Sequence, residues 1–430
     1  MENMIETDVK TTGGGAFEIG DYIVTSRTML DDGRRLLIPD GSEVDAGEYP
    51  LLAATIADSV SPGFAFSSGT GNMETYDLDG NLDANRAVTI KSYYGNDDYS
   101  YWDGKAWLTS DLAFTGTNRK ILGLTVSDDG LNVLIIGDSV GDNYIQWQRS
   151  TDGGVTFGAR KEMTFTTGPY FSKINGCEGN ADGSEILISF RNPDTASVEL
   201  HKSVDSGESF QLHKTLIDAP NVRMKASRDL LTIALHLQGY DRIELSKDGG
   251  SMFNSIILEP QVVAGAESSY QIAVGPDGST IVVANYYTGV MQISTDSGET
   301  WKVVTPVIFN YDQSVYSLGF TLGQIVIGKT SNSIHVSLRL RKDVSTADVY
   351  VTSSFDSGET WTNSFMSNTG KTENYNPNGL IVSSNGLKVM CLINGGGNPL
   401  ARIATFNQGK LLPNLTGESV PWKIVADSLS

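Results

Sequence analysis

The side chains that most often carry out protein chemistry are present, but not at the spacing of a known catalytic or metal-binding motif. The four histidines lie far apart, without the spacing of zinc ligands. The sequence contains no phosphate-binding loop, nucleophile elbow or paired-cysteine motif. We therefore expect no metal site and no cofactor. The histidines are His201, His213, His236 and His335.

Two other kinds of side chain could act on a ligand. A glycosidase needs two carboxylates at a defined separation, but among 51 acidic residues candidate pairs occur everywhere and indicate no particular reaction. An anionic substrate needs several convergent arginines, because a guanidinium binds a carboxylate through two parallel hydrogen bonds. The sequence alone does not show which arginines converge. They include Arg119, Arg149, Arg160, Arg191, Arg223, Arg242, Arg339, Arg341 and Arg402.

Aromatic side chains could stack on sugar rings, although packing against strands is their commoner role. Clusters of them occur around Trp102 and at Tyr286-Tyr287. We take Arg191, Trp102, Tyr286 and Tyr287 as candidate ligand contacts, and we assign no catalytic residue.

One motif, Ser-x-Asp-x-Gly-x-Thr-aromatic, recurs five times with small variations. The Ser and Asp side chains can accept hydrogen bonds from backbone N–H groups and so fix a turn. The Gly can adopt a positive φ, and we expect the closing aromatic ring to pack onto its own strand pair. The characteristic residues of the five copies are Ser150, Asp152, Gly154 and Phe157; Ser203, Asp205, Gly207 and Phe210; Ser246, Asp248, Gly250 and Phe253; Ser294, Asp296, Gly298 and Trp301; and Ser354, Asp356, Gly358 and Trp361.

The spacing of the motif predicts a repeat fold. Its Asp residues are 53, 43, 48 and 60 residues apart, the length of a four-stranded propeller blade with insertions. Two degenerate units, Trp102–Trp107 and Ile403–Lys410, bring the total to seven between about residues 64 and 418. We predict an all-β fold, a β-propeller of seven four-stranded blades, with six as the alternative. The strand-like tail Val420–Val425 could close the ring.

Composition narrows the function further. Charges of 31 basic and 51 acidic residues give a net charge of −20, which argues against binding to nucleic acid or to anionic lipid. Cys177 and Cys391 lie in apolar runs and are expected to be small core residues. We find neither an N-terminal signal peptide nor an apolar stretch of membrane-spanning length.

The five copies resemble the Asp box, or BNR repeat, of sialidases and related propellers. In that family the boxes are structural and lie away from the active site. The resemblance also implies a Phe/Tyr-Arg-Ile-Pro motif in the first blade, with three arginines gripping the substrate carboxylate. The nearest match here, Phe190-Arg191-Asn192-Pro193, lies in a middle blade, so we interpret Arg191 as a strand-end residue and lean against an enzyme.

The N-terminal 62 residues differ from the rest. Gly20-Asp21, then Arg35–Gly41 and Glu48–Ile56, resemble the collar-like module of phage tail-fibre proteins, although Ile38-Pro39 departs from that pattern. Pro50 suits the first turn of a short helix over Leu51–Ala57. We predict a small N-terminal module of α+β or β-rich structure over residues 1–62, which would anchor the chain to a virion, and a propeller over residues 63–430.

Three functions remain open. The first is a phage tail-fibre-like virion protein, made in the host cytoplasm, whose propeller binds a host-surface glycan or receptor, or a neighbouring virion subunit. The second is a glycoside hydrolase on the virion, either sialidase-like or a polysaccharide depolymerase. The third is a structural capsid or baseplate decoration subunit. Other virion proteins are the expected partners of the N-terminal module, and a homo-oligomer, a trimer by analogy, is expected.

Overall fold

The chain separates into two compact units, described here one at a time. In the computed structural model, unit 1 comprises residues 1–60 and 403–430, and unit 2 comprises residues 61–402. The structure describes residues 22–24, 36–37, 74–81, 86–93, 96–102, 107–110, 112, 114, 119–139, 144–166, 174–192, 194–195, 197–216, 222–237, 240–258, 270–286, 288–305, 319–329, 333–342, 347–369, 377–383, 386, 388–393, 400–405 and 422–425.

Within unit 1 the described residues form one small antiparallel sheet. Its strands, in the order β1-β30-β2, are β1 (Tyr22–Val24), β30 (Trp422–Val425) and β2 (Leu36–Leu37). The C-terminal strand β30 therefore pairs with two N-terminal strands. The sequence analysis had assigned this segment to the propeller, as a strand that could close the ring. The predicted helix over residues 51–57 lies outside the described residues, so the α+β alternative for this module is not supported by them.

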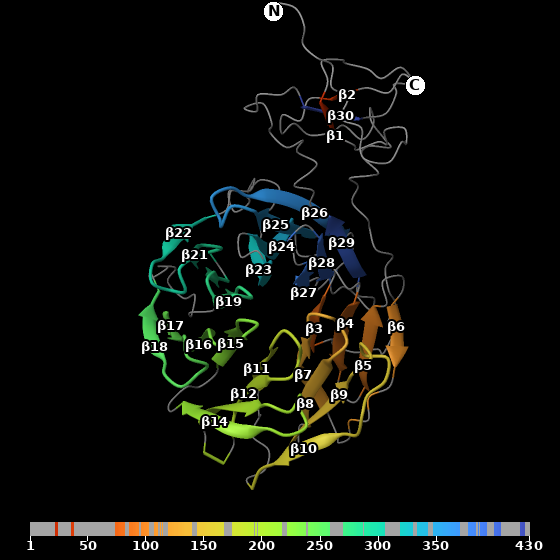
Figure 1. Ribbon diagram of the computed structural model, residues 1–430, viewed down its shortest axis with the longest axis vertical. Helices are drawn as coiled ribbons and strands as arrows, with labels where there is room; N and C mark the ends of the chain where they lie inside the picture. The colour runs from red at the N-terminus through yellow and green to blue at the C-terminus, as the bar shows by residue number, and fades with distance from the viewer. Residues whose placement is uncertain are drawn as a thin grey trace, which may run out of the picture. The chain divides into compact units, whose positions relative to one another are not determined.

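Unit 2 is all-β in its described residues, as predicted, and its sheets follow one another around a ring (Figure 1). Blade 1 consists of β3 (Glu74–Asn81), β4 (Arg86–Tyr93), β5 (Asn96–Trp102) and β6 (Trp107–Ser110). Blade 2 consists of β7 (Arg119–Val126), β8 (Val133–Ser139), β9 (Tyr144–Ser150) and β10 (Lys161–Thr164). Blade 3 consists of β11 (Ile174–Gly179), β12 (Ile186–Arg191), β13 (Val198–Ser203) and β14 (Gln211–Leu216).

The second half of the ring repeats this meander. Blade 4 consists of β15 (Val222–Ala226), β16 (Ile233–Leu237), β17 (Arg242–Ser246) and β18 (Asn254–Ile257). Blade 5 consists of β19 (Tyr270–Val274), β20 (Ile281–Asn285), β21 (Met291–Ser294) and β22 (Lys302–Val304). Blade 6 consists of β23 (Phe320–Ile327), β24 (Ile334–Arg341), β25 (Ala347–Ser354) and β26 (Thr362–Thr369). A three-stranded sheet follows: β27 (Pro377–Val382), β28 (Lys388–Ile393) and β29 (Leu400–Thr405).

The number of four-stranded blades is six, which was the alternative in the sequence analysis. Seven four-stranded blades, the first expectation, are not supported, because the last sheet has three strands in the described part of the chain. The innermost strand of that sheet, β27, packs beside both β23 and β3. The motif spacing therefore located the repeat units correctly but did not show that the last one differs in strand number.

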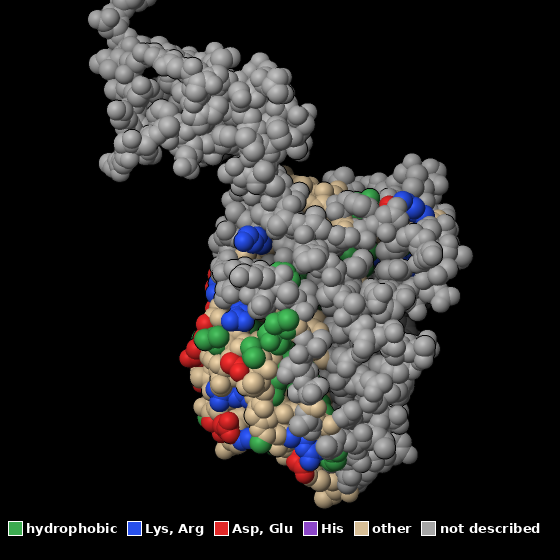
Figure 2. Space-filling view, turned by 90° about the vertical axis from the view of Figure 1, so that its right-hand side faces the viewer, with side chains coloured by type: hydrophobic (Ala, Val, Ile, Leu, Met, Phe, Trp, Pro, Cys, Tyr) green, Lys and Arg blue, Asp and Glu red, His purple; other side chains and the backbone are tan. Residues whose placement is uncertain are grey.

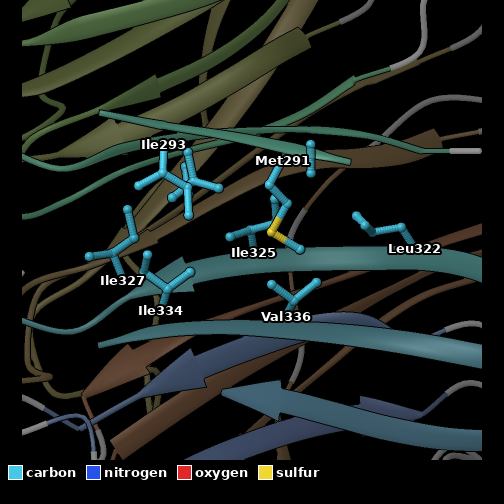
Figure 3. Packing of buried hydrophobic residues seen from close by; sticks show 10 residues of the cluster. Met291, Ile293, Leu322, Ile325, Ile327, Ile334 and Val336 are labelled. Carbon is cyan, nitrogen blue, oxygen red and sulfur yellow. The ribbon is translucent and has the colours of Figure 1, made fainter. Parts of the chain in front are cut away.

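The core lies between neighbouring blades. The second strand of a blade, as in β12, β16 and β20, is rich in β-branched and apolar residues, which favour strands and are buried on the faces that meet. Between blades 5 and 6, Met291 and Ile293 of β21 pack against Ile325 of β23 and Val336 of β24 (Figure 3). The two predicted core cysteines, one in β11 and one in β28, are buried and unbonded.

The repeated motif forms the turn between the third and fourth strands of blades 2–6. In blade 3 the Ser203 hydroxyl accepts a 2.8 Å hydrogen bond from the Gly207 N–H and donates a 2.7 Å hydrogen bond to Asp205 Oδ1. The same Oδ1 accepts the N–H of Ser209 at 2.8 Å, and Oδ2 accepts the Ser209 hydroxyl at 2.6 Å. The other four copies repeat these bonds, except that Met252 has no hydroxyl to donate to Asp248.

In blades 2 and 3 the turn also fastens the blade to the one before it. The Gly207 carbonyl accepts a 2.7 Å hydrogen bond from Trp147 Nε1 of blade 2. The Phe210 ring meets the same Trp147 edge-on, with ring centroids 5.2 Å apart. Phe157 meets Tyr99 of blade 1 in the same way at 4.9 Å. In these two blades the ring therefore contacts the neighbouring blade, whereas the closing tryptophans of blades 5 and 6 donate their Nε1–H to the glycine carbonyl of their own turn.

Gly207 should be the least replaceable residue of its turn. Its φ is +82°, and a Cβ there would lie 2.5 Å from Leu134 Cδ1 of blade 2. We expect Gly207→Ala to reduce the free energy of unfolding by about 1–3 kcal/mol. As a control, Gly158→Ala places a Cβ no closer than 3.5 Å to a neighbouring atom and should change stability little. Thermal unfolding midpoints of the two variants test this, and equal midpoints would contradict it.

The Asp residues of the motif should make the stability of the fold depend on pH in the acid range. Hydrogen bonds from the side chain and backbone of Thr300, and from Ser294, lower the pKa of Asp296 to about 2. A carboxyl whose pKa is lower in the folded than in the unfolded protein stabilises the fold above pH 4 and loses that effect as pH falls toward 2. Asp296→Asn should therefore lower the unfolding midpoint at pH 6 and have progressively less effect between pH 4 and pH 2. Glu299→Gln, which removes an exposed charge nearby, is the control.

Candidate functional site

The inner strands of the ring surround a central cavity of about 500 Å³. Residues of β3, β7, β11, β15, β19, β23 and β27 line it. Because side chains alternate along a strand, every second residue of each inner strand faces this space. The cavity is therefore the place where residues from all parts of unit 2 meet.

One end of the cavity is defined by backbone hydrogen bonds between blades, which we call the girdle. The Asp128 N–H donates to the Ala181 carbonyl, the Ala181 N–H to the Arg228 carbonyl, and the Arg228 N–H to the Pro276 carbonyl, over 2.7, 3.0 and 2.8 Å. The Asn81 side chain donates to the Asp128 carbonyl and extends the girdle to blade 1. These residues end the first strand of successive blades, so the girdle joins five blades at one end of the cavity.

Arg228 reinforces the girdle with its side chain. Its guanidinium donates to the carbonyls of Gly179, at 3.1 Å, and Val126, at 3.0 Å. Its Nε lies 3.4 Å from Asp128 Oδ1, and Lys329 Nζ lies 2.6 Å from the other oxygen of that carboxylate. One arginine thus ties together blades 2, 3 and 4, which indicates that Arg228 is a structural residue.

Two carboxylates lie deeper in the same cavity. Glu178 of β11 forms an ion pair with Lys225 of β15 over 2.8 Å. Asp79 of β3 accepts the N–H groups of Val126 and Gly80 at 2.7 and 2.8 Å. Burial raises the pKa of both carboxyls, although Arg228 opposes the shift for Asp79 and Lys225 opposes it for Glu178. The negative charge of Asp79 further raises the pKa of Glu178, so the two groups titrate under each other's influence.

The opposite end of the cavity, which we call the arginine end, carries positive charge. Arg223, at the start of β15, lines the cavity together with Tyr286. Burial lowers the pKa of Arg223, and Tyr286 opposes part of this shift. Burial and the neighbouring Arg341 lower the pKa of Arg339, and Tyr286 again opposes the shift. Tyr286 thus lies within electrostatic reach of both chain-distant arginines. Arg339 pairs in register with Thr321 of β23, which lines the cavity.

Two of these arginines have no carboxylate partner among the described residues. Arg223 makes one long hydrogen bond, 3.4 Å to the Tyr270 carbonyl. The Nε of Arg341 is buried without a hydrogen-bond partner in the described part of the chain. Each of these guanidinium groups therefore keeps donors that an anion could accept.

The sequence-derived candidates fall in different places. Tyr286 lines the cavity. Trp102, at the end of β5, is buried, with 6% of its surface exposed, and lies outside the cavity lining. Arg191 is exposed at the end of β12, outside the cavity lining. Tyr287 lies outside the described residues.

The sequence analysis did not find the cavity carboxylates and their lysine. The available signal was a charged residue inside an otherwise apolar inner strand, as in Cys177-Glu178 and Met224-Lys225. Arg223, Arg339 and Arg341 stood in the list of scattered arginines and were not among the candidate ligand contacts; the structure brings Arg223 and Arg339 within electrostatic reach of Tyr286. Across the residues for which the structure gives positions, no three His, Cys, Asp or Glu side chains are arranged to hold a metal ion. Nor does that part of the chain contain a helix long and apolar enough to cross a membrane.

Elsewhere the charged side chains are dispersed. On the face shown in Figure 2, basic and acidic side chains alternate among uncharged ones without forming a large basic patch. Among the described residues the concentration of arginines beside the cavity therefore differs from the surface around it.

Comparison with known proteins supports the architecture. No protein-family model matches the chain, and no curated protein matches its sequence. YCF48 bound to a D1 peptide matches with a TM-score of 0.51 at 13% identity, over 81% of this chain and 100% of that one. The chain has a β-propeller fold. A GH74 enzyme of Niastella koreensis matches with a TM-score of 0.54 at 17% identity, over 78% of this chain and 53% of the other, so this propeller spans about half of that enzyme.

A third propeller broadens the comparison. The β-propeller domain of Cps50 (Swd1) from Myceliophteria thermophila matches with a TM-score of 0.50 at 9% identity, over 82% of this chain and 100% of the domain. At these identities the likeness concerns the fold alone, and the site must be judged from its own residues.

Arg228 and Arg223 should differ in their effect on stability. Arg228→Gln removes two hydrogen bonds to carbonyls and an ion pair, so we expect a loss of about 2–4 kcal/mol in the free energy of unfolding. Arg223→Gln removes one long hydrogen bond and should cost less than about 1 kcal/mol. Denaturant unfolding of both variants tests this contrast, and an equal loss would mean that Arg223 is structural as well.

Proposed function

We propose that the propeller is a binding module that takes an anionic group of a host-surface glycan at the arginine end of its central cavity. The observation that carries this proposal is that Arg223 and Arg339, far apart in the sequence, both lie within electrostatic reach of Tyr286, with Arg341 beside Arg339. The chain has a net charge of −20, which repels anions in general. Positive groups beside a cavity attract an anion locally in spite of that repulsion. An acidic sugar offers both a carboxylate for the guanidinium groups and a ring face for Tyr286.

The cavity has a suitable size and lining for such a ligand. A volume of about 500 Å³ falls within the range of small-molecule sites. Its walls combine apolar residues, such as Ile272 and Leu322, with polar side chains, such as Gln271 and Thr321. This mixture supports a sugar-sized ligand, which presents hydroxyl groups and apolar C–H faces together.

We place this module on a phage particle. The basis is the resemblance of the N-terminal 62 residues to a tail-fibre collar module, so these residues would bind other virion proteins and assemble the chain as a homo-oligomer. The glycan would then be a host receptor, and the virion would be the site of action. A neighbouring virion subunit is the alternative ligand of the propeller.

A second function, glycoside hydrolysis, is favoured by a separate observation. Asp79 and Glu178 place two carboxyl groups of raised pKa in one cavity, and glycosidases use such a pair as acid and base or nucleophile. Fold neighbours of this propeller include GH74 glycoside hydrolases. Against it, Asp79 is already held by two backbone N–H groups and Glu178 by Lys225.

Binding of the full chain to acidic and neutral glycans, with released sugars measured in the same samples, separates these functions. We expect saturable binding of acidic glycans without released sugar. Arg223→Gln and Arg341→Gln should each weaken binding at least about tenfold, because each removes a guanidinium contact to the anion. Arg149→Gln, whose guanidinium lies 3.7 Å from Glu208 on the blade 3 turn, is the control.

Other results would change the assignment. Released sugar that disappears in Glu178→Gln would favour the hydrolase. Folded protein that neither binds nor cleaves any glycan would refute the receptor-binding role and favour a structural subunit of the particle.

A further inference from the structure

The ion pair in the middle of the cavity lies beside the place where the proposed anion would sit. Glu178 Oε1 bonds Lys225 Nζ at 2.8 Å, and 18% of the Glu178 side chain and 39% of the Lys225 side chain remain exposed, toward the cavity that both residues line. Lys225 follows Arg223 by two residues on β15, so both side chains leave the same face of the strand, about 7 Å apart. A ligand held by Arg223 therefore approaches the Glu178–Lys225 pair.

The charges around Glu178 are balanced without a ligand. Asp79 faces it from β3, Lys225 from β15, and Arg228 from the girdle. Arg228 in turn meets Asp128, which also binds Lys329. Three carboxylates thus accompany three cations. The carboxylates are Asp79, Asp128 and Glu178, and the cations are Lys225, Arg228 and Lys329. An anion that enters this space disturbs the balance by one negative charge, and the arginines of the arginine end are the cations beside it.

We propose that Glu178 couples the cavity to protons: an anion that binds beside Arg223 drives one proton onto the Glu178 carboxyl, so that the site holds its ligand more tightly in acid. This inference rests on the proposed function, since it concerns the same ligand. Protonation removes the negative charge of Glu178, which would otherwise repel the anion. Glu178 would then determine specificity for charged over neutral sugars.

The chemistry of the carboxyl supports this coupling. Burial and the charge of Asp79 already raise its pKa above the ordinary value, and a further negative charge raises it again. Because proton uptake and anion binding favour each other, the affinity for the anion must rise as pH falls between the pKa of the free protein and that of the complex. At about 7 Å and an effective dielectric constant of about 20, removal of one charge changes affinity roughly 10- to 50-fold.

The test measures the affinity of the full chain for glucuronate and for neutral glucose between pH 4.5 and pH 8. For the unaltered protein we expect glucuronate affinity to rise as pH falls, by at most about tenfold per pH unit, and glucose affinity to stay level. Glu178→Gln should bind glucuronate as tightly at pH 8 as the unaltered protein does in acid, with a flat profile. Glu185→Gln, which breaks an exposed pair with Lys202 on the same blade, should keep the original profile.

Each outcome decides a different claim. A Glu178→Gln variant that binds glucuronate but keeps the original pH profile would overturn the coupling and leave the binding site standing. An unaltered protein that binds no glucuronate at any pH would overturn the proposed function, and the coupling with it. Thermal unfolding of Glu178→Gln at each pH shows that the variant is folded. If it is not, Glu178→Asp, which keeps a titrating carboxyl, should retain a sloping profile.

Discussion

Five blades of this propeller depend on the hydrogen bonds that a single aspartate makes inside a turn. A blade alone is a four-stranded sheet with two apolar faces, which is stable only when neighbours cover both. In blade 3 the Ser-x-Asp-x-Gly turn fixes the backbone so that a glycine carbonyl and an aromatic ring contact the preceding blade. The local turn therefore also contributes to the packing between blades.

The rigidity of this ring allows polar groups to occupy its middle. Buried charges are costly unless they are paired, and the ring brings together carboxylates and cations from five different blades. Glu178 meets Lys225 across a blade boundary, and Asp128 meets both Arg228 and Lys329. Among the cations that line the cavity, Arg223 has no described carboxylate partner, and this imbalance distinguishes the arginine end from the girdle.

Much of the architecture could be predicted from the sequence, because the motif is local. A turn that needs Ser, Asp and Gly at fixed positions leaves a visible repeat, and its spacing gives the length of a blade. The site left no comparable pattern. Lys225 and Glu178 are 47 residues apart, and their contact arises only from the angle between neighbouring blades. The burial of Trp102 was equally invisible, since the sequence does not show which face of a strand an aromatic residue at its end covers.

The girdle has a direction, and this affects how the ring resists deformation. Each amide in it donates to the next blade, but the relay reaches Pro276, whose nitrogen carries no hydrogen. It begins at a side chain, Asn81, and ends at an imino acid, so in the described residues it is an arc with two ends and not a continuous hoop. The arc links blades 1 to 5, and between blades 5 and 6 none of its backbone links is found in the described residues. There the buried cluster between the two blades, and the contact of Lys329 with Asp128 across the cavity, take the place of the missing link.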